Sequence, residues 1–234
     1  MIAQADEPLV RWDWVADHLT RFCRNCIPTV LAQHLQLTGI AVGVGILIAL
    51  PLAVLAFRHR RLYPPITWVT GVLYTIPSLA LFMLLIPITH ISTLTAEIGL
   101  VSYTLLILIR NTVAGLDGVP EDTKEAALAM GFTRRQLLWR VELPLALPAI
   151  IAGIRIATVT TVGLVTVTAL IGMGGLGRLI RDGLQTFFPT PTVVGATLSV
   201  ALAVAADVLL LGVQRGLSPW TRRRLRRAGV RAEG

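Results

Sequence analysis

The sequence predicts an all-α transmembrane protein with about five spanning helices. Of its 234 residues, 54% are hydrophobic and only 15% are charged, and the mean hydropathy is +0.72. Soluble domains usually carry about 25% charged residues, so this chain lacks the groups that normally solvate a protein surface. Several of its apolar stretches reach the roughly 20 residues that a helix needs to cross a bilayer.

Five stretches of the sequence meet this length requirement. The first is Leu35–Phe57, which carries no charge, and the second is Ile66–Ile88, which contains Pro77 and Pro87. Membrane helices tolerate proline because neighbouring groups satisfy the freed carbonyls. Each of the other three predicted spans contains an ionisable residue, and they are Glu97–Leu116, Leu145–Ile171 and Thr192–Leu211.

The distribution of basic residues predicts the orientation of these spans. If the segment Arg58–Arg61 is cytoplasmic, residues 117–144 and the C-terminal tail are cytoplasmic too, and these segments hold fourteen Lys and Arg residues against five outside. Cytoplasmic loops carry such an excess. We therefore expect a multi-pass protein of the cytoplasmic membrane with its N-terminus outside and its C-terminus inside. The net charge of +8 reflects this placement and not nucleic-acid binding, because no polar domain presents a basic face.

Besides Glu97 at the start of the third span, ionisable residues inside the predicted spans are Arg110, Arg155 and Asp207. Charged groups at membrane depth are costly, and they usually face the interior of a bundle or extend to the interface. All three lie toward the cytoplasmic ends of their spans, so we expect them to act as interface anchors. Membership of a translocation path is the alternative.

The segment before the first span has features of its own. Trp12 to Pro28 mixes tryptophans with polar residues, which is typical of a short helix at headgroup level; a poorly ordered terminus is the alternative. No basic region leads into an apolar run here, so we expect the first span to be an uncleaved anchor. Cys23 and Cys26 are too few ligands for a zinc site, and we interpret them as incidental cysteines on the outer side, either oxidised or free.

The cytoplasmic connection between the third and fourth spans, residues 117–144, predicts a first short helix. Pro120 fits the first helical turn, and the two acidic residues that follow it favour the positive end of the helix. Gly131 is expected to end this helix, because glycine adopts the left-handed conformation of a terminal residue at little cost.

A second short helix should follow directly. Thr133 and Gln136 have the spacing of a capping box, and we expect the helix that they start to give way to the fourth span at Pro144. A structured connection of this length predicts a docking surface, and a helix that merely lies on the bilayer is the alternative. The chain then divides into an external segment (1–34), a membrane domain (35–212) with its cytoplasmic loop (117–144), and a basic cytoplasmic tail (213–234).

The residues of this loop resemble a family motif. Glu125-Ala126-Ala127, then Gly131 after three residues, then Leu143-Pro144, is similar to the EAA loop of ABC-importer permeases. The resemblance implies a type I ABC-importer permease architecture, in which the two short helices are coupling helices that sit in a groove of a cytoplasmic ATPase subunit. The small side chains of Ala126 and Ala127 would then permit close approach of that subunit. The implied coupling residues are Glu125, Ala126, Ala127, Gly131, Thr133 and Gln136.

Further motifs are similar to the osmoprotectant branch of this family, whose permeases carry glycine betaine, choline, carnitine or proline. The matching segments are 75–81, 109–112, 141–148, 153–155 and 171–177, and one departure is Met173, where alanine is usual. Glycine clusters let a backbone bend or pack closely, so segment 171–177 is a candidate gate at the outer mouth, with a plain re-entrant turn as the alternative. The candidate gate or path residues are Pro77, Ser78, Asn111, Gly172, Met173, Gly174 and Gly175.

The resemblance implies solute translocation by a chain that is not itself an enzyme. The sequence contains no Ser-His-Asp, paired-carboxylate or metalloprotease pattern, and we expect no cofactor on this chain, with ATP and Mg on the partner ATPase. The expected partners are cytoplasmic ATPase subunits, a second permease subunit (identical or paralogous), an external solute-binding protein and membrane lipid, but no nucleic acid. The alternatives are an ABC permease for another small solute such as methionine or phosphonate, a transporter or channel without an ATPase, and a structural membrane protein.

Overall fold

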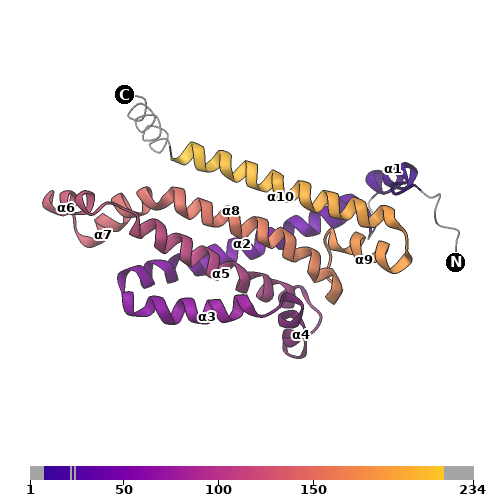
Figure 1. The fold of residues 1–234 in the computed structure, drawn as a ribbon, viewed down its shortest axis with the longest axis horizontal. Helices are drawn as coiled ribbons and strands as arrows, with labels where there is room; N and C mark the ends of the chain where they lie inside the picture. The colour runs from indigo at the N-terminus through magenta and orange to yellow at the C-terminus, as the bar shows by residue number, and fades with distance from the viewer. Residues whose placement is uncertain (1–7, 22, 24, 219–234) are drawn as a thin grey trace, which may run out of the picture.

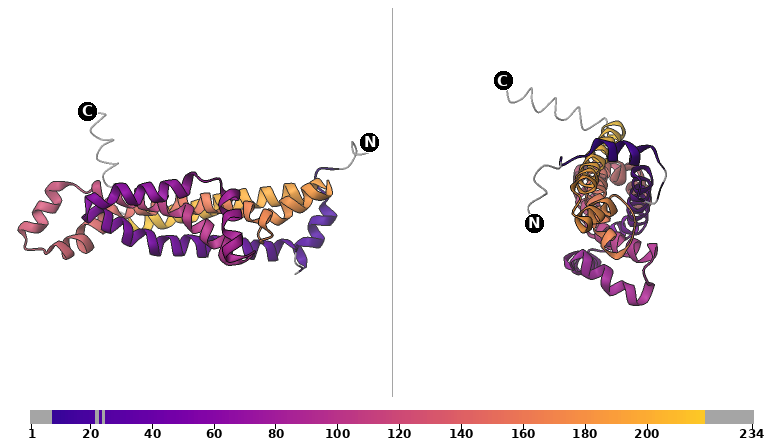
Figure 2. Two further views of the ribbon diagram at one scale, coloured as in Figure 1. Left: turned by 90° about the horizontal axis from the view of Figure 1, so that it is seen from below. Right: turned by 90° about the vertical axis from the view of Figure 1, so that its right-hand side faces the viewer.

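The computed structural model describes residues 8–218 of the chain, except residues 22 and 24. Within this part, helices form an elongated bundle (Figures 1 and 2). Four of them are long and apolar enough to cross a membrane, or five spans result if one bent helix pair is counted as a span. The predicted all-α class with about five spans is confirmed. The long helices are α2 (Ile27–Arg58), α5 (Thr93–Asp117), α8 (Leu143–Thr168) and α10 (Pro189–Leu217).

The centre of the bundle is α5, which packs against both α2 and α8. Glycines allow these close approaches: a methyl group at Gly153 of α8 would lie 2.5 Å from Cβ of Asn111 in α5, and one at Gly45 of α2 would overlap the hydroxyl of Thr104. Membrane helices commonly associate through such small residues, because lipid offers no hydrophobic driving force between helices.

The second predicted span is not a straight helix. It consists of α3 (Tyr63–Thr75) and α4 (Ser78–Thr89), which meet at an angle of 97°. The expectation of one continuous helix over Ile66–Ile88 is therefore wrong. Pro77 has no N–H group and disfavours helical geometry at the residue before it, and Ile76 is extended there, with ψ of 129°. The carbonyl that this break frees at Ile76 accepts a hydrogen bond from the Tyr103 hydroxyl of α5.

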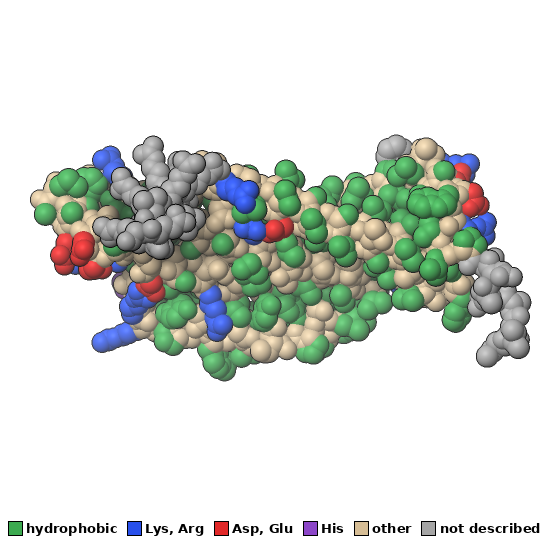
Figure 3. Space-filling model, turned by 45° about the horizontal axis from the view of Figure 1, so that its top comes forward, with side chains coloured by type: hydrophobic (Ala, Val, Ile, Leu, Met, Phe, Trp, Pro, Cys, Tyr) green, Lys and Arg blue, Asp and Glu red, His purple; other side chains and the backbone are tan. Residues whose placement is uncertain are grey.

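Different elements occupy the two ends of the bundle. The connection between α5 and α8 projects from one end, and α1 (Trp12–Thr20) and α9 (Gly177–Thr186) lie at the other (Figure 1). On the face shown in Figure 3, charged side chains gather mainly toward these two ends, with an apolar stretch between them. This distribution fits a protein whose middle lies in hydrocarbon and whose ends lie in water.

The segment before α2 folds against α9 and α10. Helix α1 lies within the region where a short helix was predicted, and Trp14 makes an edge-to-face contact with Phe188. The Asn25 amide donates to Asp182 of α9 at 2.8 Å. Cys23 and Cys26 form a disulfide directly before α2, a pairing that the sequence had left open. The basic tail from residue 219 onward lies outside the described residues.

Candidate functional site

The projecting connection begins with helix α6 (Glu121–Ala129), for which Pro120 is the N-cap. Gly131 ends it in the left-handed conformation, with φ of +87°. The Gly131 N–H bonds to the carbonyl of Leu128, and the Phe132 N–H bonds to the carbonyl of Ala127. This pair of bonds defines a Schellman motif, so the predicted termination of the first helix at Gly131 is confirmed.

The second helix of the connection is α7 (Arg134–Leu137), and it starts with the predicted capping box. The Gln136 N–H donates to the Thr133 hydroxyl at 3.3 Å, and the Thr133 N–H donates to the Gln136 side-chain oxygen at 2.8 Å.

Helix α7 does not stop before the fourth span. A π-helical turn, η2 (Leu138–Glu142), carries it directly into α8. The N–H group of Leu143 reaches back five residues to the Leu138 carbonyl, and this wider turn accommodates Pro144, which has no N–H group. We expected the second short helix to give way to the fourth span at Pro144. The structure instead has one continuous helix, which widens locally just before Pro144.

The predicted coupling residues fall into two groups. Five of them are exposed on the connection: Glu125, Ala126, Gly131, Thr133 and Gln136. Ala127 is only 2% exposed, and its backbone carbonyl belongs to the Schellman motif. The expectation that the Ala127 side chain permits approach of a partner is thus not supported, because that side chain packs inside the chain.

Contacts with the end of α2 hold the connection in place. The Arg58 guanidinium donates to the Arg134 carbonyl of α7 at 2.7 Å, and Arg60, just after α2, forms an ion pair with Asp117 at the end of α5. On α6, the Lys124 ammonium lies 5.9 Å from the ring centroid of Phe57. Sequence patterns alone did not reveal these contacts, because each joins residues that are far apart in the chain. They make the connection a part of the α2–α8 framework.

The glycine-rich segment lies at the opposite end of the bundle. Gly172 and Gly175 both have positive φ, at +83° and +87°, which explains the need for glycine at these two positions. The Gly175 N–H donates to the Gln33 side-chain oxygen at 3.3 Å. Met173 packs at the edge of a buried cluster that includes Phe82 and Leu100.

A buried histidine fixes the same segment, and sequence analysis did not single it out. His34 of α2 is fully buried; its Nδ1 accepts from the Leu176 N–H at 3.2 Å, and its Nε2 lies 3.1 Å from the Val162 carbonyl. An N–H group can only donate and a carbonyl can only accept. Both bonds therefore require the neutral imidazole with its proton on Nε2, and this one side chain ties together α2, α8 and the glycine-rich segment.

The other candidate gate or path residues lie elsewhere. Pro77 and Ser78 form the corner between α3 and α4. Asn111 lies in the α5–α8 contact beside Gly153, and its amide donates to the Ile107 carbonyl of its own helix at 2.8 Å. Phe82 of α4 belongs to the buried cluster on which Met173 packs. That all these residues form one gate or path stays a prediction.

Two of the ionisable residues in the spans, Arg155 and Asp207, pair with each other. The Arg155 guanidinium makes two hydrogen bonds of 2.9 Å to the Asp207 carboxylate and a third, of 3.1 Å, to Gln214. Gln214 in turn donates to the Pro148 carbonyl at 2.9 Å. Arg155 and Asp207 therefore join α8 to α10. Their position at the membrane interface stays a prediction. Arg110 is exposed on α5.

The structure combines a multi-span helical bundle with a projecting pair of short helices that contacts the end of α2, as expected for the membrane subunit of an ABC importer. Residues 41–223 match the family described as the inner membrane component of binding-protein-dependent transport systems. The chain belongs to this family, and it is the membrane component of an ABC importer.

Individual proteins of known function and solved structures resemble the chain over most of its length. The chain is 42% identical to an osmoprotectant import permease protein of Salmonella typhimurium, OsmW, over 80% of this chain and 89% of that protein. It is 35% identical to a choline transport system permease protein of Bacillus subtilis, OpuBB, over 83% and 89%. Among solved structures, the MetNI methionine ABC transporter in an inward-facing conformation matches with a TM-score of 0.72 at 25% identity, over 79% of this chain and 93% of that one.

Proposed function

We propose that this permease subunit carries a small osmoprotectant, such as glycine betaine, choline, carnitine or proline, across the cytoplasmic membrane. The observation that carries this proposal is the 42% identity to an osmoprotectant import permease over 80% of the chain. Methionine is the second candidate solute, because a methionine transporter shares the fold, but the identity there is 25%. The higher identity favours the osmoprotectant class.

We place the docking site of the cytoplasmic ATPase subunits on the projecting connection. ATP and Mg would bind to those ATPase subunits. The exposed residues Glu125 and Ala126 offer a carboxylate beside a small side chain, so a partner can approach the helix closely. Closure of an ATPase dimer would draw the connections of two permease subunits together. Because Arg58 bonds to α7 and α7 continues into α8, the movement would reach the membrane helices directly.

Recognition of the solute is assigned mainly to an external binding protein. Quaternary ammonium groups are usually held in cages of aromatic side chains, and aromatic residues make up only 6% of this chain. The permease should therefore offer a weakly binding path between two subunits, identical or paralogous, with the glycine-rich segment near its outer end.

A transport assay tests the substrate class. The chain, its ATPase and its binding protein are produced in a strain that lacks osmoprotectant uptake, and accumulation of radiolabelled glycine betaine, choline, carnitine, proline and methionine is measured. We expect accumulation of at least one osmoprotectant at about tenfold or more above a control whose ATPase cannot hydrolyse ATP. Accumulation of methionine alone would reject the substrate class and keep the importer.

For the orientation, we propose the N-terminus outside, with segments 1–34 external and 117–144 and 213–234 cytoplasmic. In support, the Arg60–Asp117 ion pair joins two of the segments that were assigned to the cytoplasm. In a variant with Cys23→Ser and Cys26→Ser, Asn25→Cys should react with a membrane-impermeant thiol reagent in intact cells. Gly229→Cys should react only after lysis, and the opposite pattern would overturn this topology.

A further inference from the structure

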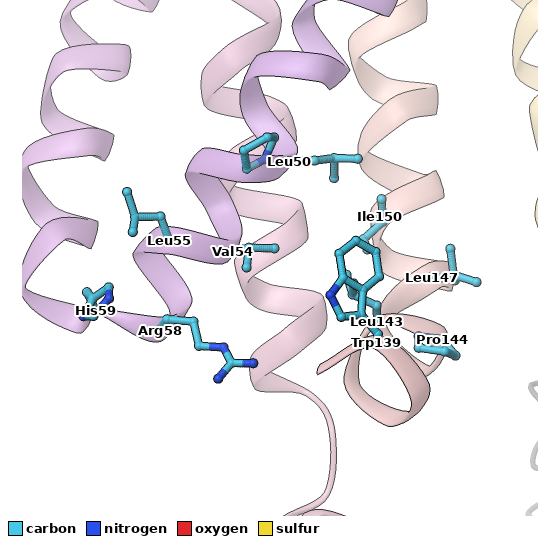
Figure 4. A pocket seen from close by; sticks show the side chains of 11 residues that line it. Leu50, Val54, Leu55, Arg58, His59, Trp139, Leu143, Pro144, Leu147 and Ile150 are labelled. Atoms are coloured by element: carbon cyan, nitrogen blue, oxygen red, sulfur yellow. The ribbon is translucent and has the colours of Figure 1, made fainter. Parts of the chain in front are cut away.

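A groove of about 700 Å³ opens between α2 and α8 at the end of the bundle that carries the projecting connection (Figure 4). Its walls come from two helices, with Leu50, Val54 and Leu55 on the α2 side and Leu143, Leu147 and Ile150 on the α8 side. These side chains are apolar, so the groove is suited to a hydrocarbon ligand.

The polar groups of the groove are confined to its outer end. Arg58 and His59 line it where α2 ends, and the Trp139 indole, which is 63% exposed, lines it from the π-helical turn before α8. In Figure 4 the Arg58 side chain extends from α2 toward the side of α8. Among the residues that the structure describes, no acidic residue lines the groove; Glu142 interacts electrostatically with Arg58 but lies outside the lining. An apolar slot with a cation at one end has the charge pattern that complements an anionic amphiphile.

The length of the groove fits one leaflet of a bilayer. From Leu50 to Arg58 is eight helical residues, or about 12 Å, against about 15 Å for half of the hydrocarbon core. Tryptophan is enriched at the headgroup level and arginine on the cytoplasmic side of membrane proteins, which fits Trp139 and Arg58 at this end of the groove. The basic tail beyond residue 218 is a poor occupant, because its arginines carry the same charge as Arg58.

We propose that this groove binds an anionic phospholipid of the cytoplasmic leaflet, with an acyl chain between α2 and α8 and the headgroup phosphate on Arg58. Basic pockets between membrane helices on the cytoplasmic side are suited to such headgroups. The proposal rests on the orientation given under the proposed function, but not on the transported solute. The bound lipid would contact α2 and the α7–α8 junction at once, beside the hydrogen bond from Arg58 to Arg134, and would brace the base of the connection.

Tryptophan quenching tests the site in the full-length protein. Trp12, Trp14, Trp68 and Trp220 are replaced by phenylalanine, so that Trp139 is the remaining tryptophan. The protein is reconstituted in phosphatidylcholine vesicles that contain an equal fraction of either dibrominated phosphatidylglycerol or dibrominated phosphatidylcholine. We expect about twofold stronger quenching of Trp139 by the brominated anionic lipid. Arg58→Gln should remove the difference, and Arg58→Lys should retain it.

Trp68 provides the matched control. It is 70% exposed on α3, in the helix that directly follows Arg60 and Arg61, so it reports general enrichment of anionic lipid around these basic residues. If anionic lipid is enriched only in the groove, the two brominated lipids should quench Trp68 to nearly the same extent in a protein where it is the remaining tryptophan.

Filling the groove gives a second check. Leu147→Phe should reduce the quenching of Trp139 by both brominated lipids while the protein still elutes as a folded species. Equal quenching of Trp139 by the two lipids, or a difference that survives Arg58→Gln, would overturn the site. Weak quenching by both lipids in the parent protein would show that protein covers the groove, a second copy included, and would reject the proposal as well. Because no transport is measured, these outcomes stay separate from those of the uptake assay.

Discussion

Gly131→Val is expected to abolish most ATP-dependent uptake while leaving membrane insertion intact. Gly131 has φ of +87°, and a Cβ atom there would meet no other atom within 4 Å, so the substitution acts through the backbone alone. A side chain in the left-handed region costs about 1–2 kcal/mol, which lowers the population of the native turn about tenfold. The membrane helices do not depend on this turn, so uptake and co-purification of the ATPase should fall without loss of folded protein.

Asparagine at the same position is the matched control. Gly131→Asn adds a side chain of similar size to valine, but asparagine tolerates the left-handed conformation, so uptake should stay within about twofold of the parent. Ala126→Trp, on the exposed surface of α6, should block ATPase docking with the turn intact. Wild-type uptake and ATPase co-purification in both Gly131→Val and Ala126→Trp would show that this connection is not the coupling element.

Arg155→Leu is expected to lower the yield of folded protein several-fold. Asp207 would then be left without the two hydrogen bonds from Arg155 at membrane depth, where an unpaired charge is costly. The contact between α8 and α10 would weaken as well. Size-exclusion chromatography of the solubilised protein before and after heating measures the effect.

Removing both charges should restore much of the yield of folded protein that Arg155→Leu loses. In Arg155→Leu with Asp207→Leu no charge is left unpaired at membrane depth, where a charge without a partner is costly. Arg110→Gln serves as the control, since Arg110 is an exposed arginine on α5, and it should change the yield little. A double variant no more stable than Arg155→Leu alone would contradict this account of the pair.

Features that depend on neighbouring residues could be predicted from the sequence. The left-handed turn at Gly131 and the capping box of Thr133 and Gln136 are examples, because their hydrogen bonds close within a few residues. Spans could likewise be located from unbroken apolar stretches, although the helices extend further than predicted: α2 starts at Ile27 and not at Leu35. Polar residues in its first two turns, such as Gln33 and His34, interrupt the apolar stretch from which the start of the helix was predicted.

Features that depend on distant residues could not be predicted. Arg155 and Asp207 are 52 positions apart, and nothing in either span indicates that their side chains meet. The same holds for His34, which lies 142 positions from Leu176. Pro77 was expected to be tolerated within a span, but α3 and α4 meet there at 97°. The Tyr103 hydroxyl that bonds to the Ile76 carbonyl at this bend lies 27 positions away in the chain.

The uninterrupted run from Arg134 to Ile171 has a mechanical consequence. Its 38 residues make a rod of about 57 Å at 1.5 Å per residue. The close approach of Gly153 to Asn111 lies near its midpoint and can serve as a fulcrum. A tilt of about 5° there would displace each tip by about 2.5 Å, in opposite directions. A displacement of α7 in one direction would thus displace the glycine-rich segment, on the far side of the membrane, in the opposite direction.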